Sequence, residues 1–485
     1  MSKKKIFIST SIPFVNAPPH IGHALEFVQA DVLARYYRFL NYDVFFLSGT
    51  DENAQKNVQA AEEKGLNPQK LIKKYSERFR QFKTSLNISF DDFIRTTEER
   101  HKRGSQKLWR LCQKDIYKKS YRGWYCLGCE AFVTKKDLVN GKCPEHQREP
   151  EFVEEENYFF ALKKYQKKIK EVIVNDKIKI RPKERKNEIL SFIDQGLEDF
   201  SISRDAKRLK NWGVPVPNDP TQIIYVWFDA LINYLTGLNF SGDQKLYKKF
   251  WESDSKKIHV IGKGIIRFHA IYWPAMLLSA KIPLPSHEFI HGYVTINGEK
   301  ISKSLGNVID PFKVVRKYGA DATRYYLLKE IHPFKDGDFT YKRFEEVYNA
   351  DLANGLGNLV QRIAKLCEKA KLDSSNFKTK KGDLEKRVAN HLGKFEFNQA
   401  LEIIWKYISA LDKYVERKRP WEKSGQELKE ILRNIIIGDE GDQSLLEITR
   451  LLKPFLPETA RKIEDIFTAQ EIKAPTKLLF PKFKA

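Results

Sequence analysis

The chain has 485 residues, too many for one ordinary hydrophobic core, which predicts about two to four structural units. Hydrophobic residues make up 41% and charged residues 31%, which fits a soluble globular protein. With 86 lysines and arginines against 63 acidic residues, the net charge is +23. This excess favours polyanions, although a solubilising lysine-rich surface explains it equally well. No apolar run approaches the roughly 20 residues of a membrane-spanning helix, and the run after Lys5 is too broken for an export signal.

The first elements predicted are a strand at 4–10, a helix at 21–40 and a second strand at 43–47. A strand–helix–strand succession normally gives parallel strands in a nucleotide-binding α/β sheet. Ligands of such sheets bind beyond the carboxyl ends of the strands, which is where residues 13–23 and Asp51 are expected to lie.

A similar succession recurs later, with a strand at 258–261, a glycine turn and a helix that continues through Leu278. An insertion, roughly residues 116–225, separates the two halves. From about Tyr341 onward helices are predicted. One helix face is formed by Ala400, Ile404, Ile408, Leu411 and Val415, and a further amphipathic stretch at 445–467 is interrupted by prolines. The expected fold is therefore a Rossmann-like α/β core with an inserted module, followed by a helical bundle.

Four metal-binding side chains are paired within the insertion. Cys126 and Cys129 are separated by two residues, as are Cys143 and His146, and this spacing presents four donors tetrahedrally to one Zn²⁺. Gly128 and Gly141 suit the tight turns of such a knuckle. Four protein donors leave no open position, so the predicted site is structural. The alternative is a set of reduced core cysteines with an incidental histidine.

Two short motifs suit phosphate. His20-Ile21-Gly22-His23 opens the first predicted helix, where free backbone N–H groups attract phosphate and Gly22 permits close approach. Alone, this histidine pair also fits core packing or half of a metal site. Lys300 and Lys303, in a loop after an extended run at 289–296, suit a leaving pyrophosphate, whereas a bare lysine pair is more typical of a solvated loop.

Together these motifs resemble the HIGH and KMSKS signatures of the class I aminoacyl-tRNA synthetases, with Ile301 in place of the more familiar methionine. The resemblance extends from Ile6 to about Pro481. It implies adenylation of an amino acid by ATP and Mg²⁺, followed by tRNA charging. His20 and His23 would stabilise the α-phosphate, and the lysines would hold the pyrophosphate. The implied ATP site consists of Asn16, His20, Gly22, His23, Gly262, Lys300, Ser302 and Lys303.

Several segments resemble the methionyl-tRNA synthetase family in particular. The resemblance assigns the Asp51 carboxylate to the α-ammonium of methionine, and Arg204 to an auxiliary catalytic role. Aromatic walls suit a flexible thioether, although composition alone fits ordinary core packing. Gly264 replaces an acidic residue of many relatives, so either weaker anchoring of the ATP ribose or compensation by another residue is expected. The side-chain pocket implied by the resemblance is Ile12, Phe14, Trp227, Ala230, Leu231, Tyr234, Ile265 and His269.

The resemblance also implies that Asn358, Arg362 and Trp421 read the anticodon of tRNA(Met); without it they would be a solvated helix face and a packing residue. A monomer is expected because no dimerising domain follows the bundle, and a cytoplasmic enzyme is expected from the cysteine usage. The implied domains are two catalytic halves at 1–115 and 226–340, a connective insertion at 116–225 with its zinc knuckle at about 120–155, and an anticodon-binding domain at 341–485.

Two alternatives remain. A synthetase for another amino acid is disfavoured, because a cysteine enzyme would place zinc inside its substrate pocket and the enzymes for leucine, isoleucine and valine usually carry a larger editing insertion. A non-catalytic tRNA-binding protein with the same fold is disfavoured because His20, His23, Lys300, Lys303 and Asp51 are all present.

Overall fold

The computed structural model describes residues 3–126, 131–133, 138–144, 148–301, 306–374, 377, 383–438 and 444–483. The chain divides into two compact units. The first unit comprises Met1–Pro19, Asn41–Lys83 and Ser89–Ile290, and the second comprises His20–Leu40, Thr84–Ile88 and His291–Ala485. No helix in the described ranges has both the length and the apolar character needed to cross a membrane.

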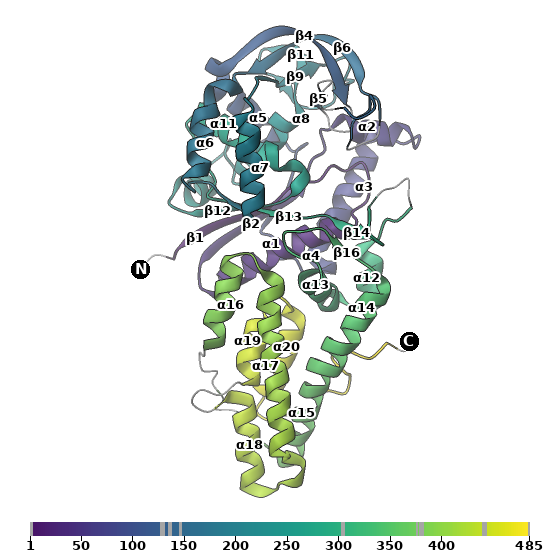
Figure 1. Cartoon of the computed structure of the whole chain (residues 1–485), viewed down its shortest axis with the longest axis vertical. Helices are drawn as coiled ribbons and strands as arrows, with labels where there is room; N and C mark the ends of the chain where they lie inside the picture. Colours follow the sequence, from purple (N-terminus) through teal and green to yellow (C-terminus); the bar gives the residue numbers. More distant parts are fainter. Residues whose placement is uncertain are drawn as a thin grey trace. The chain divides into compact units, whose positions relative to one another are not determined.

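A six-stranded sheet forms the centre of the first unit (Figure 1). β1 pairs in parallel with both β2 and β12, so that Ile8 lies between Phe46 and Ile258. The three strands predicted at 4–10, 43–47 and 258–261 are thereby confirmed. In spatial order the strands are β3 (Asp92–Arg95), β2 (Asp43–Thr50), β1 (Lys5–Thr10), β12 (Lys256–Gly262), β13 (His287–His291) and β7 (Lys179–Arg181).

The main core of this unit lies between the sheet and a group of helices. Phe7 and Leu47 from the strands share it with Trp109, Ile173 and Trp273 from the helices, all of them buried. Burial of such large side chains contributes about 1.5–3 kcal/mol each, before the entropy cost of ordering them. The helices that contribute to this core are α5 (Glu99–Cys112), α6 (Gln166–Val174), α7 (Lys183–Asp194) and α11 (Trp273–Ala280).

The expected insertion, roughly residues 116–225, contains two antiparallel sheets as well as α6, α7 and the edge strand β7 of the central sheet. Its longest hairpin pairs β4 with β6, from Ile116 opposite Phe160 to Tyr125 opposite Glu151. The strand order of one sheet is β5 (Ala131–Val133), β4 (Ile116–Cys126), β6 (Glu151–Phe160) and β8 (Phe200–Ser201), and that of the other is β10 (Pro215–Val216), β11 (Asp219–Ile224) and β9 (Ser203–Asp205).

The helix predicted after the second glycine turn is not continuous. A 3₁₀ turn at Lys263–Ile265 and a π-helical stretch at Phe268–Tyr272 precede α11. Pro274 lies in the first turn of α11 and has no backbone N–H, so it cannot donate to the preceding turn as a regular α-helix requires. Hydrophobic periodicity does not reveal such an interruption.

The second unit is mainly helical. Its helices are α1 (Ile21–Phe39), α12 (Pro311–Tyr318), α13 (Ala320–Lys329), α14 (Tyr341–Val347), the π-helical η7 (Tyr348–Gly357), α15 (Asn358–Ala370), α16 (Asp383–Gly393), α17 (Phe397–Lys418), α18 (Gly425–Ile437), α19 (Leu445–Leu452) and α20 (Pro457–Phe467). A small sheet contains β15 (Glu299–Lys300), β14 (Val294–Ile296) and β16 (Gly337–Asp338). In α17, the predicted apolar face from Ala400 to Val415 is buried, and Figure 1 shows this helix alongside α19.

A buried ion pair anchors α1 within this unit. Arg324 of α13 is completely buried and lies 2.7 Å from the carboxylate of Asp31. Its guanidinium also donates to the carbonyls of Phe455 (2.8 Å), Pro454 (2.9 Å) and Leu86 (3.2 Å). The charge is thus matched by one carboxylate and three carbonyls, as a buried arginine requires.

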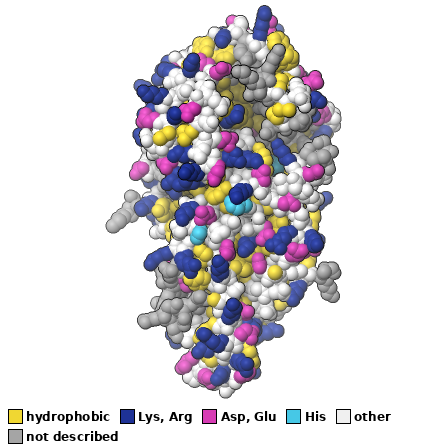
Figure 2. Space-filling model, viewed as in Figure 1, with side chains coloured by type: hydrophobic (Ala, Val, Ile, Leu, Met, Phe, Trp, Pro, Cys, Tyr) yellow, Lys and Arg dark blue, Asp and Glu magenta, His cyan; other side chains and the backbone are white. Residues whose placement is uncertain are grey.

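The large positive charge is distributed over the surface. Figure 2 shows lysine and arginine side chains interspersed with acidic ones on the visible face. Many of these charges form pairs, such as Lys317 with Glu345 at 2.8 Å and Arg343 with Glu330 at 2.7 Å. Exposed pairs of this kind contribute about 0–1 kcal/mol each, so the surface charge matters mainly for solubility and for polyanion attraction.

One buried acid in the central sheet stands out because of its surroundings. Glu288 in β13 is fully buried, and neither of its carboxyl oxygens has a hydrogen-bond partner among the described residues. Burial raises the pKa of Glu288 to about 8. The folded protein therefore holds a proton there at neutral pH that the unfolded chain has already released.

Replacing Glu288 with glutamine removes this titration. Between about pH 4.5 and 8 the folded wild type binds more protons than the unfolded chain, so its stability relative to Glu288→Gln falls as pH rises, by at most about 1.4 kcal/mol per pH unit. Urea unfolding midpoints across this pH range measure the divergence. Parallel pH profiles for the two proteins would contradict it.

Candidate active site

Asp51 follows the last residue of β2, and only 1% of its surface is exposed. Its backbone N–H donates to the carbonyl of Pro13 at 2.9 Å, and Phe14 forms a parallel bridge with Asp51. The carboxylate accepts a hydrogen bond from the backbone N–H of Asn53 at 3.1 Å. The loop after β1 and the acid after β2 therefore meet at the carboxyl ends of their strands. This position was predicted for Asp51 and for residues 13–23, and the contacts of Pro13 and Phe14 confirm it for the start of that loop.

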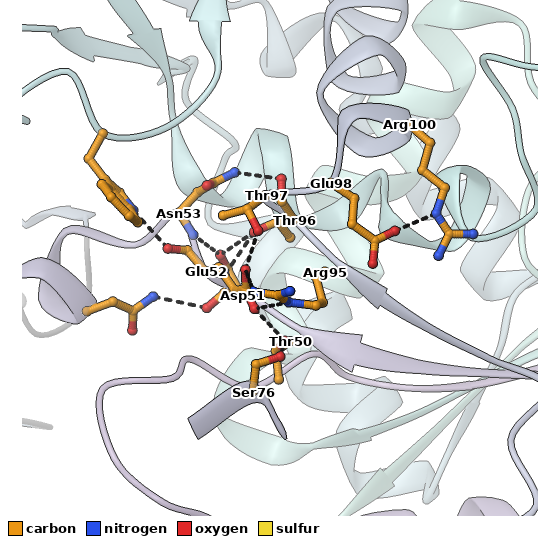
Figure 3. Close-up of polar contacts among 12 residues, drawn as sticks. Thr50, Asp51, Glu52, Asn53, Ser76, Arg95, Thr96, Thr97, Glu98 and Arg100 are labelled. Carbon is orange, nitrogen blue, oxygen red and sulfur yellow. Dashed lines mark hydrogen bonds and ion pairs between the residues drawn. The ribbon is translucent and has the colours of Figure 1, made fainter. Parts of the chain in front are cut away.

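Glu52 stabilises the carboxyl end of β2 through side-chain and backbone hydrogen bonds (Figure 3). Its buried carboxylate accepts from Arg95 Nε at 2.7 Å and Nη2 at 3.1 Å, and it also accepts from the hydroxyl of Thr97. Its backbone N–H donates to Thr96 Oγ1 at 2.8 Å. The two-pronged contact joins the ends of β2 and β3 and fixes the backbone on which Asp51 is carried. The sequence analysis missed Arg95 and Thr96, because their partners lie more than 40 residues away.

A second buried network joins Asp51's loop to the helices behind it. Asn53 Nδ2 donates to the carboxylate of Asp229 at 2.7 Å, and the other oxygen of that carboxylate accepts from the hydroxyl of Ser105. His101 Nε2 lies 3.2 Å from the same oxygen as Ser105. Asp229 belongs to α8 (Val226–Leu231), the helix that also carries Trp227, Ala230 and Leu231. The network therefore links the Asp51 strand end to the expected pocket wall.

An aromatic group lies beside this network. The Trp227 indole stacks on the Phe268 ring with centroids 3.7 Å apart and planes 4° apart. Phe14 meets Trp227 edge-on at 6.0 Å, and the ammonium of Lys56 lies 3.6 Å from the Phe14 ring centroid. The structure thus brings together Phe14 and Trp227 as the sequence predicted, and Ile265 packs against the same cluster. Phe268 was missed, because a phenylalanine in an apolar run gives no sign of its partner.

A hydrogen-bonded pair of rings lies in the same unit. Tyr234 Oη is 2.7 Å from His269 Nε2, and His269 Nδ1 is 3.0 Å from the carbonyl of Ile265. A carbonyl only accepts, so Nδ1 carries a hydrogen, and in the neutral ring Nε2 accepts the Tyr234 proton. The tyrosine oxygen therefore presents lone pairs. Both side chains are buried, and the other expected pocket residues Ala230, Leu231 and Ile12 are buried or partly buried.

His259 completes the ring group. Its Nδ1 lies 2.7 Å from Ser9 Oγ, and its ring centroid is 4.0 Å from that of Tyr234. Burial, followed by the proximity of His269, holds the pKa of His259 well below its ordinary value. The ring is therefore neutral at physiological pH and packs as a flat, weakly polar surface behind Tyr234.

The Arg204 side chain is buried and makes several contacts with its neighbours. It is 3% exposed, donates to Ser201 Oγ at 2.9 Å and to the Ser203 carbonyl at 2.7 Å, and lies 4.3 Å from the Tyr225 ring centroid. These contacts stabilise the corner between β8 and β9. Asn16 is partly buried in the loop after β1, and Gly262 is the last residue of β12.

In the second unit, His20 and His23 form a reciprocal cap at the start of α1. The backbone N–H of Gly22 donates to His20 Nδ1, and the backbone N–H of His20 donates to His23 Nδ1, both at 3.1 Å. Because each Nδ1 is an acceptor, each neutral ring carries its hydrogen on Nε2. The rings stack with centroids 3.8 Å apart. The motif therefore presents two Nε2–H donors at a helix N-terminus, an arrangement suited to phosphate oxygens.

The electrostatic setting of this motif is unusual. Burial, together with the neighbouring His20 and His291, holds the pKa of His23 well below its ordinary value. His23 is therefore a neutral donor at pH 7. A Cβ at Gly22 would lie 3.1 Å from two atoms of the His20 ring, so the glycine leaves room for the histidine ring itself. The sequence analysis had assigned that room to a nucleotide.

Lys300 is exposed at the end of β15, and its ammonium lies 5.1 Å from the ring centroid of Tyr293. After the loop, Asn307 Nδ2 donates to the Lys300 carbonyl at 3.1 Å. Ser302 and Lys303, which the sequence placed with Lys300, lie outside the described residues.

Two of the four expected metal ligands are described. Cys126 ends β4, and Cys143 follows a tight turn in which Val139 and Lys142 exchange backbone hydrogen bonds of 2.9 and 3.0 Å. Gly141 in that turn has a φ of +75°, so the prediction of a glycine turn is confirmed here. Both cysteines are buried, whereas Cys129 and His146 lie outside the described residues.

The three residues expected to read an anticodon come from neighbouring parts of the bundle. Asn358 is exposed at the start of α15, and Arg362 follows one turn later. The guanidinium of Arg362 contacts the carboxylates of Asp412 and Glu416, which lie one turn apart on α17. Trp421 comes soon after the end of α17 and is 43% exposed, which is unusual for an indole.

Comparison with known proteins identifies the family. A family model described as tRNA synthetases class I (M) matches residues 6–150 and 136–364. The methionine--tRNA ligase of Fusobacterium nucleatum is 42% identical over 482 residues, which cover 96% of this chain and 74% of that protein. This chain is a methionyl class I tRNA synthetase family member. The resemblance noted in the sequence is thereby confirmed.

Solved structures agree with this methionyl synthetase membership. The Mycobacterium tuberculosis methionyl-tRNA synthetase in complex with methionyl-adenylate matches with a TM-score of 0.88 and 36% identity, covering 99% of each chain. The methionine--tRNA ligase of Thermotoga maritima is 39% identical over 95% of this chain and 74% of its own length. The class I synthetase fold expected from the sequence is therefore the fold of this chain.

Proposed function

We propose that this chain activates methionine with ATP to methionyl-adenylate and transfers the methionyl group to tRNA(Met). The observation that carries the proposal is the buried Asp51 carboxylate in the same compact unit as the Phe14–Trp227–Phe268 aromatic group, in a family member of this specificity. A carboxylate suits the α-ammonium, and aromatic faces suit a polarizable thioether.

Methionine is proposed to bind with its ammonium on Asp51. The hydrogen bonds of Asn53, together with the Glu52–Arg95 contact, hold that carboxylate in place before substrate arrives. Such preorganisation reduces the cost of binding. The side chain would contact the expected pocket residues Ile12, Phe14, Trp227, Ala230, Leu231, Tyr234, Ile265 and His269.

The first chemical step is proposed to be attack of the methionine carboxylate on the α-phosphorus of ATP, with pyrophosphate leaving. The Nε2–H groups of His20 and His23 would donate to the phosphate as charge develops, and Lys300 and Lys303 would neutralise the pyrophosphate. Mg²⁺ enters with ATP and offsets phosphate charge. Asn16, Gly22, Gly262 and Ser302 complete the proposed ATP site, with Arg204 in an auxiliary role through the corner it stabilises.

In the second step the terminal ribose hydroxyl of tRNA is proposed to attack the activated carbonyl, releasing AMP. Recognition of the anticodon is assigned to Asn358, Arg362 and Trp421. An exposed indole offers a face on which a splayed base stacks, and the amide and guanidinium match base edges. We assign tRNA binding to residues 341–485, catalysis to 1–115 and 226–340, and the connective insertion to 116–225, in a monomeric, cytoplasmic enzyme.

A structural Zn²⁺ is proposed for the knuckle of Cys126, Cys129, Cys143 and His146. The described part fits it, because two buried thiols and a glycine turn suit a tetrahedral thiolate site. When bound, the ion would crosslink the two arms of the knuckle. It would take no part in adenylation.

Amino-acid-dependent ATP–pyrophosphate exchange tests the proposed function. With Mg²⁺ and each of the twenty amino acids in turn, exchange should depend chiefly on methionine. Exchange driven by another amino acid would keep the enzyme class and refute the specificity. Absence of exchange by folded, zinc-loaded protein would instead favour a non-catalytic tRNA-binding protein.

Replacing Trp421 with alanine should lower tRNA charging about tenfold to 100-fold, because the stacking surface for a base is lost. ATP–pyrophosphate exchange should stay unchanged, since no tRNA takes part in it. The control is Glu422→Ala, which alters the adjacent exposed residue in the same 3₁₀ turn. Equal loss of charging and exchange in Trp421→Ala would show a folding role.

Purified protein should contain about one zinc ion per chain, measured by elemental analysis. Cys143→Ser should lose the ion and lower the thermal midpoint, because metal binding contributes directly to folding of a small module. Cys112→Ser is the matched control, since Cys112 is a buried thiol of α5 outside the knuckle. Full zinc occupancy in Cys143→Ser would refute the assignment.

A further inference from the structure

A buried pair within the second unit joins α1 to the segment that begins at His291. His291 is the last residue of β13, and its Nε2 lies 2.8 Å from Glu26 Oε2 of α1. The side chains of His291 and Glu26 are only 7% and 10% exposed. Glu26 comes three residues after His23, so the pair lies within one turn of the phosphate-suited histidines.

The hydrogen bonds of His291 make this contact directional. Its Nδ1 lies 2.7 Å from the carbonyl of Gly292, which can only accept. Both ring nitrogens therefore face oxygens. Burial removes the water that would compete for these two contacts. The contact holds α1 and the segment that begins at His291 at one spacing.

The segment that begins at His291 leads to Lys300 through a rigid corner. A Cβ at Gly292 would lie 2.3 Å from the backbone of Lys335, so this glycine is packed directly on another chain segment. The backbone N–H of Tyr293 donates to Asp336 Oδ1 at 2.8 Å, and Gly337 N–H donates to the Tyr293 carbonyl at 3.0 Å. From this corner β14 and β15 run to Lys300.

The loop that follows Lys300 is called the lysine loop here. The segment after this loop also contacts α1. The backbone N–H of Ile21 donates to the carbonyl of Ile309 at 3.0 Å. Ile21 is the first residue of the helix, so its N–H has no partner within the helix. The next residue, Asp310, caps α12 by accepting from the Phe312 N–H at 2.8 Å. The first turns of α1 thus contact both described flanks of the lysine loop.

We propose that Glu26 and His291 are positioning residues for adenylate formation, holding the strand that ends at Lys300 in register with the helix that begins at His20 and His23. This inference rests on the proposed function. Phosphate groups must meet donors from both segments at once, so their spacing matters as much as their presence. A misplacement of about 1 Å is enough to slow such a reaction about 100-fold.

The pair predicts a specific kinetic pattern. Its loss changes the spacing of the phosphate-binding segments and leaves the residues proposed for methionine intact. The rate constant for adenylate formation should therefore fall, whereas the KM for methionine should not change. A residue that merely stabilised the fold would lower the amount of active protein without separating these two quantities.

The variants Glu26→Gln, His291→Gln and the double substitution test this in the full-length protein. Each single variant should lower the single-turnover rate of adenylate formation about tenfold to 100-fold, and the double variant should be no slower than the worse single one. Hydrogen exchange, followed by mass spectrometry, should accelerate in residues 294–301 and 306–310. Glu385→Gln is the control, because it breaks a partly buried pair with Arg450 (2.7 Å) between α16 and α19.

Additive effects of the two substitutions, or unchanged exchange in both flanks, would overturn the proposal. So would an equal loss of rate in Glu385→Gln, or a methionine KM that rises in step with the lost rate. If the wild type showed no ATP–pyrophosphate exchange, the proposed function would fail and adenylation roles with it. Hydrogen exchange would still report whether the pair holds the flanks, so the two failures are distinguishable.

Discussion

The second unit depends on one completely buried charge. Arg324 is removed from water, and such a charge is tolerated only when it is paired and hydrogen-bonded. Asp31 and three backbone carbonyls supply these contacts, and the carbonyls come from residues 86, 454 and 455. Helix α1 is therefore fixed from its middle by long-range contacts. The histidines at its first turn are held by a helix that is itself anchored, which is a better base for a catalytic group than a loop.

Hydrophobic periodicity and single glycine residues correctly predicted strands, a helix face and a turn. Apolar strands around Ile8 and Phe46, the apolar face from Ala400 to Val415 and the turn at Gly141 all follow from periodicity or from one residue's conformational freedom. The π-helical break before Pro274 did not, because hydrophobic spacing tolerates it. The pocket residues and the methionine specificity were predicted from the family resemblance and not from periodicity.

The candidate site shows the same division more sharply. His20, His23 and Asp51 were found from their motifs, and the structure shows how they are held. The groups that surround Asp51 and Trp227 were not predicted: Arg95, Asp229 and Phe268 have ordinary neighbours in the sequence, and Asn53 and Asp229 are 176 positions apart. Positioning residues are hard to predict because their chemistry is generic and only their placement is special. Charge and composition carried still less information about the site, since basic and acidic side chains are interspersed over the visible face (Figure 2).

The histidine cap has a consequence for turnover. His23 uses one nitrogen to accept a backbone hydrogen and is kept neutral by its surroundings, so it offers phosphate a hydrogen bond without a full positive charge. A fixed cation would bind the spent nucleotide as firmly as the reacting one. A neutral donor gains most where negative charge is momentarily concentrated and loses its advantage once that charge is dispersed. The cap, which we propose binds phosphate during adenylation, would therefore release the product readily.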